Sequence, residues 1–327
     1  MNSREMKITR RSAVAALAGA AVLPAAAWAQ FERAVRLIVA SSAGSTIDVI
    51  GRTLQQPLAA AVGAPVVVEN IAGAGSVIAM QTLARAPADG SVLALQTNNM
   101  VTAPLMMKTA PYDTVKDFTP IAMIGAIPLA LVTNASKVGA ANAKEFVALL
   151  KTTGDKLNYG SSGNGTTLHL AVEQIQDELG VKLNHVPYKG VAPMVNDLIG
   201  GQIDFAVSAL PPVQPHINSG ALRAIGLLSN QRVAVAPEIP TLAEQGFPNF
   251  NMDVWMAVLG PRNMAPATVK KVHDALLATV NTPGIREALE KQGNIVKVST
   301  SAEALVVVQR DVAKYSALAK KINLTPQ

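Results

Sequence analysis

Two loops rich in glycine and hydroxyl residues could supply hydrogen-bond donors to an anion. The first reads Ala-Ser-Ser-Ala-Gly-Ser-Thr over residues 40–46, and the second reads Gly-Ser-Ser-Gly-Asn-Gly-Thr-Thr over residues 160–167. Each follows a short apolar run and precedes a helical pattern, so its last amides become the first amides of a helix. Those amides have no partner inside the helix and carry the positive end of its dipole, which favours a bound carboxylate or phosphate.

A capped turn is the simpler explanation of either loop alone, because Gly, Ser and Thr are also the commonest residues at helix starts and turns. The presence of both loops favours a binding site, because open α/β sheets bind ligands at loops that follow their strands. We keep Asp48 as a capping acid that interacts with the helix dipole. The sequence predicts a ligand site made of Ser41, Ser42, Ser45, Thr46, Ser161, Gly163, Asn164, Gly165, Thr166 and Thr167, with Asn98 and Ser208 as weaker members.

The sequence contains no recognisable motif for binding a metal or a cofactor. The four histidines are scattered without zinc-ligand spacing, and the chain has no cysteine. Gly73 and Gly75 begin like a dinucleotide fingerprint, but the third glycine position is Ile78. A Gly-Lys-Ser/Thr phosphate loop is absent from the sequence. We therefore predict that the protein uses neither a metal nor a cofactor.

A secreted serine hydrolase is the alternative from another functional class. Residues 160–163 read Gly-Ser-Ser-Gly and resemble a nucleophile elbow, with Ser161 or Ser162 as nucleophile and His169 or His185 as base. The Gly-x-Ser-x-Gly pattern requires glycine at position 164, where this chain has asparagine. Because the two loops hold hydroxyls and amides but no acid, base or thiol, they favour holding a ligand over transforming it.

The N-terminus predicts an export signal over residues 1–29. Arg10 and Arg11 precede an alanine-rich apolar stretch, and Ala27-Trp28-Ala29 has the small-x-small pattern of a cleavage site. The paired arginines favour the twin-arginine route, but Ala13 and Val14 depart from its usual pattern, so Sec export stays open. Without a cysteine for lipid attachment, we expect an unanchored protein in the periplasm after cleavage near Ala29.

Composition excludes other functional classes and indicates two domains. Removing the signal changes the balance of basic and acidic residues from 28 minus 22 to 24 minus 21, a formal net charge of +3. This charge is too mild for a nucleic-acid-binding protein, whose basic residues would cluster. The long uncharged run 118–136 contains Pro120 and Pro128 and divides into two expected strands, 121–124 and 129–132, so we reject a membrane span. The remaining length exceeds the usual size of one compact unit, and we expect a monomer of two domains.

Apolar periodicity predicts alternating strands and helices. Strands are expected at 35–39, 66–68, 92–95, 203–207 and 254–259. After the two loops, apolar residues recur at spacings of three and four over 47–62 and 168–179, and similar stripes cover 191–198, 269–280 and 305–322. This alternation is typical of an α/β fold with parallel strands.

With these residues in view, the mature chain resembles, nearly end to end, the extracytoplasmic solute-binding proteins of tripartite tricarboxylate transporters, the Bug family. The strongest match lies in the middle of the chain, where Tyr159 begins a segment that runs through the second glycine-rich loop to His169 and Leu170. The other matching segments are Arg36-Leu37-Ile38-Val39 with Gly44 and Asp48, Val68-Glu69-Asn70, Gly73-Ala74-Gly75, Pro111-Tyr112-Asp113, Asp117-Phe118, residues 185–190, residues 197–204, Pro240-Thr241 with Glu244 and Gly246, and Trp255 before Gly260-Pro261.

The resemblance implies a two-lobed flytrap that closes on a small carboxylate-bearing molecule and presents its closed form to membrane permease subunits. By analogy, domain I is 30–128 plus 253–327, domain II is 129–252, and the chain crosses between them at two strand segments. The departure is in the first loop, where Ser41 replaces the family's aromatic residue and Ser45 its second glycine. A ligand-sensing subunit of a signalling system is a further alternative, which the sequence does not separate from transport.

Overall fold

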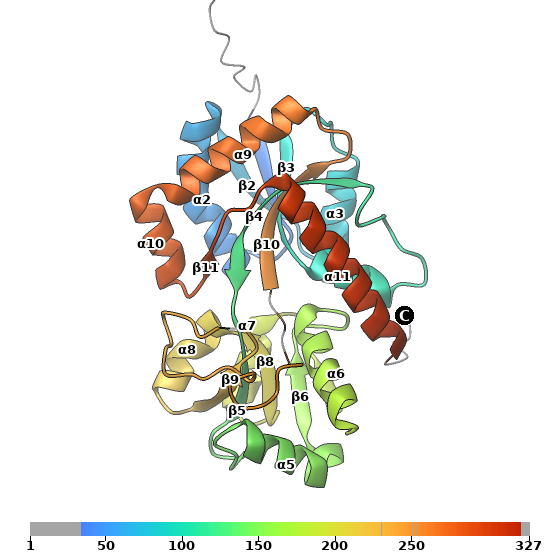
Figure 1. Ribbon diagram of the computed structural model, residues 1–327, viewed down its shortest axis with the longest axis vertical. Coiled ribbons are helices and arrows are strands. Elements are labelled where there is room, and N and C mark those ends of the chain that lie inside the picture. The colour runs from blue at the N-terminus through green and yellow to red at the C-terminus, as the bar shows by residue number, and fades with distance from the viewer. Residues whose placement is uncertain (1–33, 230, 251, 253, 322–327) are drawn as a thin grey trace, which may run out of the picture.

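The computed structural model describes residues 34–229, 231–250, 252 and 254–321, and Figure 1 shows two lobes, one above the other. The predicted export signal, 1–29, lies outside the described residues. Each lobe is built around one β-sheet with helices packed against it. The upper lobe, lobe I, contains the six-stranded sheet, and the lower lobe, lobe II, contains the five-stranded sheet.

Lobe I combines the first part of the described chain with the last. Its strand order across the sheet is β11-β4-β10-β3-β1-β2. The strands are β1 (Val35–Val39), β2 (Val66–Asn70), β3 (Val92–Thr97), β4 (Phe118–Ile127), β10 (Val254–Pro261) and β11 (Ile295–Val296). The helices are α2 (Thr46–Val62), α3 (Val77–Ala84), α4 (Asn99–Thr102), α9 (Pro266–Asn281), α10 (Pro283–Lys291) and α11 (Ser301–Lys321), with short 3-10 turns η1 (Ala74–Ser76) and η2 (Ala103–Met106).

Lobe II is formed by the middle of the chain. Its strand order across the sheet is β7-β6-β8-β5-β9. The strands are β5 (Leu129–Asn134), β6 (Asn158–Ser161), β7 (Asn184–Pro187), β8 (Phe205–Ala209) and β9 (Leu222–Leu227). The helices are α5 (Ala143–Thr153), α6 (Thr167–Leu179), α7 (Val191–Ile199) and α8 (Leu210–Asn218), with the 3-10 turn η3 (Gly154–Lys156).

Both sheets are mixed, and in each lobe the strand reached by crossing from the other lobe runs against the parallel strands, as does the short edge strand β11, which is antiparallel to β4. β1 pairs in parallel with β2 and β3, and β6 pairs in parallel with β7 and β8. β5, which enters lobe II, is antiparallel to β8 and β9, and β10, which returns to lobe I, is antiparallel to β3 and β4. The predicted α/β two-lobed fold is confirmed, with sheets more mixed than the sequence indicated.

The crossings explain how the two lobes are connected. β4 ends at Ile127 and β5 begins at Leu129, so Pro128 alone separates a strand of lobe I from a strand of lobe II. The second connection follows β9 and reaches β10 at Val254. The limits of the two domains given above stay a prediction. In the described ranges, no helix combines the length and the apolar character that a membrane crossing requires.

The two helices that follow the glycine-rich loops have well-defined ends. Ser45 caps α2 by accepting a hydrogen bond from the amide of Asp48, and Thr166 caps α6 in the same way from His169. Gly63 and Gly180 end these helices with left-handed backbone angles, φ 74° and 64°. The apolar stripes of α2 and α6 are buried against their sheets. The sheets and these stripes hold the two loops rigidly in place.

Candidate functional site

A cavity of about 130 Å³ lies where the two lobes meet, and both glycine-rich loops contribute to its walls. Loop 1 (40–46) follows β1 of lobe I, and loop 2 (160–167) follows β6 of lobe II. Because the two loops belong to different lobes, the cavity that they share forms only where the lobes come together. Its polar lining is Ser41, Ser45, Thr46, Gln96, Thr97, Asn99, Ser162 and Thr167. Its apolar lining is Ala40, Ile47, Ile127, Leu129, Leu168, Val191, Ala209 and Val254.

Four of the predicted site residues line this cavity: Ser41, Ser45, Thr46 and Thr167. The other eight do not belong to its lining: Ser42, Asn98, Ser161, Gly163, Asn164, Gly165, Thr166 and Ser208. Ser42 and Asn164 are exposed. Ser208 lies inside β8, which extends past the expected strand 203–207, and its buried hydroxyl donates to the carbonyl of Ala209 at 3.1 Å.

The first turn of α2 contains backbone amides without a partner among the described residues, and a carboxylate, Asp48, that is paired with Arg52. Asp48 is 2% exposed, and its carboxylate accepts hydrogen bonds from the amide of Gly44 at 2.8 Å and from Arg52 at 3.0 Å. Burial alone raises the pKa of Asp48, but Arg52, Gly44 and Asn70 together lower it, so the carboxylate is charged and paired. Thr46 and Ile47 begin the helix beside the cavity, and their amides accordingly lie at its positive end.

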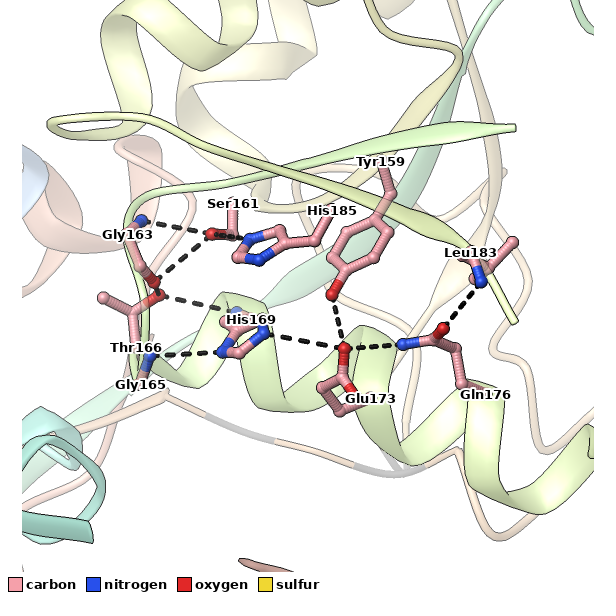
Figure 2. A network of polar contacts seen from close by, with 10 residues as sticks. All are labelled: Tyr159, Ser161, Gly163, Gly165, Thr166, His169, Glu173, Gln176, Leu183 and His185. Atoms are coloured by element: carbon pink, nitrogen blue, oxygen red, sulfur yellow. Dashed lines mark hydrogen bonds and ion pairs between the residues drawn. The ribbon is translucent and has the colours of Figure 1, made fainter. Parts of the chain in front are cut away.

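Loop 2 rests on an internal network that Figure 2 displays. The amide of Gly165 donates to Nδ1 of His169 at 3.1 Å, and Nε2 of His169 lies 3.5 Å from Glu173. Glu173 also accepts from the Tyr159 hydroxyl at 2.5 Å. Because an amide can only donate, Nδ1 of His169 must be unprotonated in this arrangement. Burial raises the pKa of Glu173, but bonds from His169 and Tyr159 outweigh it and lower the pKa overall.

Ser161 belongs to the same network and not to the cavity. Its hydroxyl oxygen lies 2.7 Å from Nε2 of His185, and it also accepts from the amide of Gly163 at 3.2 Å. The His185 ring stacks against both Tyr159 and His169, with ring centres 4.7 and 4.2 Å away. Burial, and then His169, lower the pKa of His185 to about 4. The network therefore holds the backbone of loop 2 in place through side chains that lie outside the cavity lining.

Thr167 joins the two lobes beside the cavity. Its hydroxyl donates to the side-chain oxygens of Asn98 and Asn99 at 2.9 and 3.1 Å, and its amide donates to Asn99 at 3.2 Å. Asn98 is fully buried and also donates to Tyr315 of α11. Asn98, predicted as a ligand contact, thus lies at a contact between the lobes. The first amide of α6 is occupied by a side chain of lobe I.

Two further contacts bring the lobes together. Gly165 has φ +73°, and a Cβ atom at this position would come within 2.1 Å of Met106 from lobe I. The conformation and the close approach both require glycine here. At the end of α11, Lys321 pairs with Asp177 of α6, where Figure 1 shows the last helix descending from lobe I to lobe II. The lobes are therefore in contact at residues outside the cavity lining as well.

A family model described as the tripartite tricarboxylate transporter family receptor matches residues 50–324. The chain belongs to this family. Protein BugT of Bordetella pertussis (strain Tohama I) is 32% identical to the receptor over 325 residues, covering 97% of this chain and 98% of BugT. The solved structure of the periplasmic binding protein BugD is 30% identical, with a TM-score of 0.81, and the match covers 90% of this chain and 99% of BugD.

A third relative was solved with a ligand. The structure of R. palustris Rpa4515 with adipate matches the receptor with 27% identity and a TM-score of 0.83, covering 90% of this chain and 99% of that one. The resemblance that the sequence indicated is confirmed, and the chain is a solute-binding receptor. In the described ranges, no three His, Cys, Asp or Glu side chains gather as metal ligands would.

Sequence reasoning missed several residues that line the cavity of the receptor. Gln96 and Thr97 end the apolar strand β3, where a polar pair directly after a buried run was a usable signal. Asn99, in the polar turn that follows this strand, lines the cavity too. The apolar members Ile127, Leu129 and Val254 belong to the ends of the crossing strands, and nothing in their residue types separates them from core.

Proposed function

We propose that the receptor captures a small organic acid between its lobes and delivers it to the membrane permease of a tripartite tricarboxylate-type transporter. The observation that carries this proposal is the cavity that loop 1 and loop 2 line from opposite lobes. The relative with bound adipate supports a carboxylate as the ligand. A guest in this position contacts both lobes at once, and it therefore favours the closed state over the open one.

The lining suits a carboxylate attached to an aliphatic body. Among the described residues, its side chains are apolar or neutral, so the acid is held by hydroxyls, amides and helix ends without a salt bridge. The volume is similar to an engineered cavity of about 150 Å³ that admits benzene. The lobes as placed enclose a short-chain acid, and a longer one requires them to separate slightly. The proposed direct contacts are Ser41, Ser45, Thr46, Ser162 and Thr167.

Five of the remaining predicted site residues hold the loops and the lobes in place. Gly163, Gly165 and Thr166 form the backbone of loop 2, Ser161 anchors it to His185, and Asn98 binds Thr167. The receptor acts as a monomer in the periplasm after removal of its export signal, with domain limits at 128/129 and 252/253. Closure then exposes a surface, formed by both lobes, for the permease to recognise.

Binding without chemistry is the second part of the proposal. A hydrolase requires an accessible nucleophile, and Ser161 is 0% exposed although its hydroxyl lies within hydrogen-bond distance of His185, as a nucleophile's would. A pKa of about 4 also makes His185 a weak base at neutral pH. Labelling of Ser161 by a fluorophosphonate probe would support the hydrolase alternative. A ligand-sensing role differs only in the partner, and co-purification with a sensor kinase and not with permease subunits would favour it.

The test is a calorimetric titration of the mature protein with aliphatic monoacids, diacids and triacids, with neutral sugars and alkyl amines as controls. We expect saturable binding of at least one carboxylic acid and none of the controls. A thermal-shift screen provides an independent measurement, because a ligand at 100 times its dissociation constant adds about 2.7 kcal/mol to stability. Binding confined to neutral or cationic compounds would refute the proposal.

A further inference from the structure

Gln96 has a buried donor group without a protein partner at the wall of the cavity. It is the penultimate residue of β3 and is 1% exposed. Its Oε1 accepts a hydrogen bond from the amide of Thr97 at 2.7 Å. Since a backbone amide can only donate, this bond determines which terminal atom is oxygen and which is nitrogen. The nitrogen Nε2 is buried and has no hydrogen-bond partner in the described part of the chain.

An unpaired amide nitrogen is unfavourable inside a protein. Buried side-chain donors are almost always paired, and the exceptions in a native structure often mark a place where a partner is supplied from outside. Gln96 belongs to the cavity lining, and its oxygen is already used within the protein. An acceptor atom of the bound acid is therefore the natural partner of Nε2.

The start of α2 lies on the same wall. The register of the sheet pairs Val39 with Leu95, so Gln96 lies next to Ala40, where loop 1 begins. Thr46 and Ile47, the first two residues of α2, line the cavity, and their amides have no hydrogen-bond partner among the described residues. The nearby Asp48 carboxylate is paired with Arg52 and does not leave this helix end with a net negative charge.

The opposite wall offers fewer open donors. In loop 2, the amide of Gly163 is bonded to Ser161, that of Gly165 to His169 and that of Thr167 to Asn99. The two loops are therefore not equivalent in this state. Lobe I presents the open donors, and lobe II presents a loop whose amides are largely satisfied before any ligand arrives.

We propose that Gln96 is a specificity-determining residue, whose Nε2 donates to an oxygen of the acid anchored at the start of α2. This inference rests on the proposed function and assigns the ends of the ligand. The carboxylate binds lobe I first, at Gln96, Thr46 and Ile47, and loop 2 then closes over the aliphatic body. A ligand without an acceptor oxygen at this end leaves Nε2 unpaired and binds weakly.

The experiment compares two variants by calorimetry with succinate, glutarate and adipate as probes. Gln96→Met removes the carboxamide but keeps an unbranched side chain of similar length. Gln96→Glu keeps the oxygen that accepts from Thr97 and replaces the donor with a second oxygen. Thr133→Val is the matched control, because Thr133 also has a buried unpartnered hydroxyl but lies in β5 outside the cavity lining.

We expect Gln96→Met to weaken binding of the best diacid by about tenfold to a hundredfold, and Thr133→Val to leave it unchanged. Gln96→Glu should bind still more weakly at pH 8, where two carboxylates repel. Its affinity should recover relative to the unaltered protein at pH 5.5, because burial favours the protonated acid, which can donate again. A purely structural role for Gln96 does not produce this pH-dependent recovery.

The outcomes separate this inference from the proposed function. If the unaltered protein binds a diacid and Gln96→Met binds it equally well, the role of Gln96 is wrong and the receptor function stands. Weak binding by Gln96→Glu with no recovery at pH 5.5 likewise refutes the donor role. If the unaltered protein binds no carboxylic acid, both proposals are wrong.

Discussion

Replacing Thr167 by valine tests whether contact between the lobes contributes to ligand affinity. The hydroxyl of Thr167 in lobe II is 2.9 Å from Asn98 Oδ1 and 3.1 Å from Asn99 Oδ1 in lobe I, so separating the lobes breaks both bonds. Removing one donor at this buried interface costs about 1 to 3 kcal/mol. The variant keeps the hydrogen bond from the backbone amide of residue 167 to Asn99, the β-branched shape of the side chain and the fold of α6.

The whole cost falls on the closed state, because the open state lacks the contact. The closed population therefore falls by about 5-fold to 150-fold relative to the open one, and the apparent dissociation constant rises accordingly where the open form is populated. Calorimetry measures the affinity, and small-angle scattering of the ligand-free protein measures closure without any ligand contact. Thr279→Val, which removes a buried unpartnered hydroxyl from α9, is the control and should change neither. Unchanged affinity and an unchanged scattering radius in Thr167→Val would refute the reasoning.

Three further perturbations have expected outcomes. The folded state lowers the pKa of His185 from 6.5 to about 4, so it binds fewer protons than the unfolded chain. The free energy of unfolding should therefore fall by up to about 3 kcal/mol as pH decreases through that window. Urea unfolding at pH 7, 5.5 and 4.5 measures this change, and His185→Gln should flatten the pH dependence. Asp48→Ala should lower the free energy of unfolding by about 1 to 3 kcal/mol, because Gly44 and Arg52 lose a buried partner. Glu69→Ala, which removes an exposed ion pair, is the control and should lower it by less than about 1 kcal/mol. Equal effects of the two substitutions on stability would contradict this prediction. Gly165→Ala should weaken ligand binding at least about tenfold through its φ of +73° and its collision with Met106, and Met106→Ala should restore part of the loss, as calorimetry can determine.

Much of the fold could be predicted from residue periodicity. The expected strand 35–39 is β1, and the expected helices after the two loops are α2 and α6. The strand expected at 203–207 begins two residues later, because apolar runs locate an element better than its ends. Helix α8 was missed, since its sequence contains Pro211, Pro212 and Pro215. Two of these prolines lie in the first turn, where the missing amide hydrogen does not matter.

The site was harder to predict than the fold. Sequence identified both loops, and the structure brings Ser41, Ser45, Thr46 and Thr167 to one cavity. It could not indicate that the amides of Gly163 and Gly165 bond to nearby side chains, because that depends on rotamers, nor that the amide of Thr167 has a partner in the other lobe. Asn99 lies 68 residues from Thr167, and the interaction depends on the relative placement of two lobes. Glycine at 165 indicated an anion-binding loop, but its close approach to Met106 is an equally good reason for glycine.

Asn99 also explains why the lobes can approach without a guest. Its side-chain oxygen accepts from both the amide and the hydroxyl of Thr167, which is the position where the end of α6 would attract an anion. A neutral side chain therefore satisfies α6 in the closed form, and this part of the closure energy does not depend on the ligand. Only contacts that differ between states shift a population. An acid bound to lobe I at Gln96 and the start of α2 keeps those contacts in both states, so the dependence of closure on the acid must come from the lobe II residues that it reaches only on closing, such as Ser162 and Leu168.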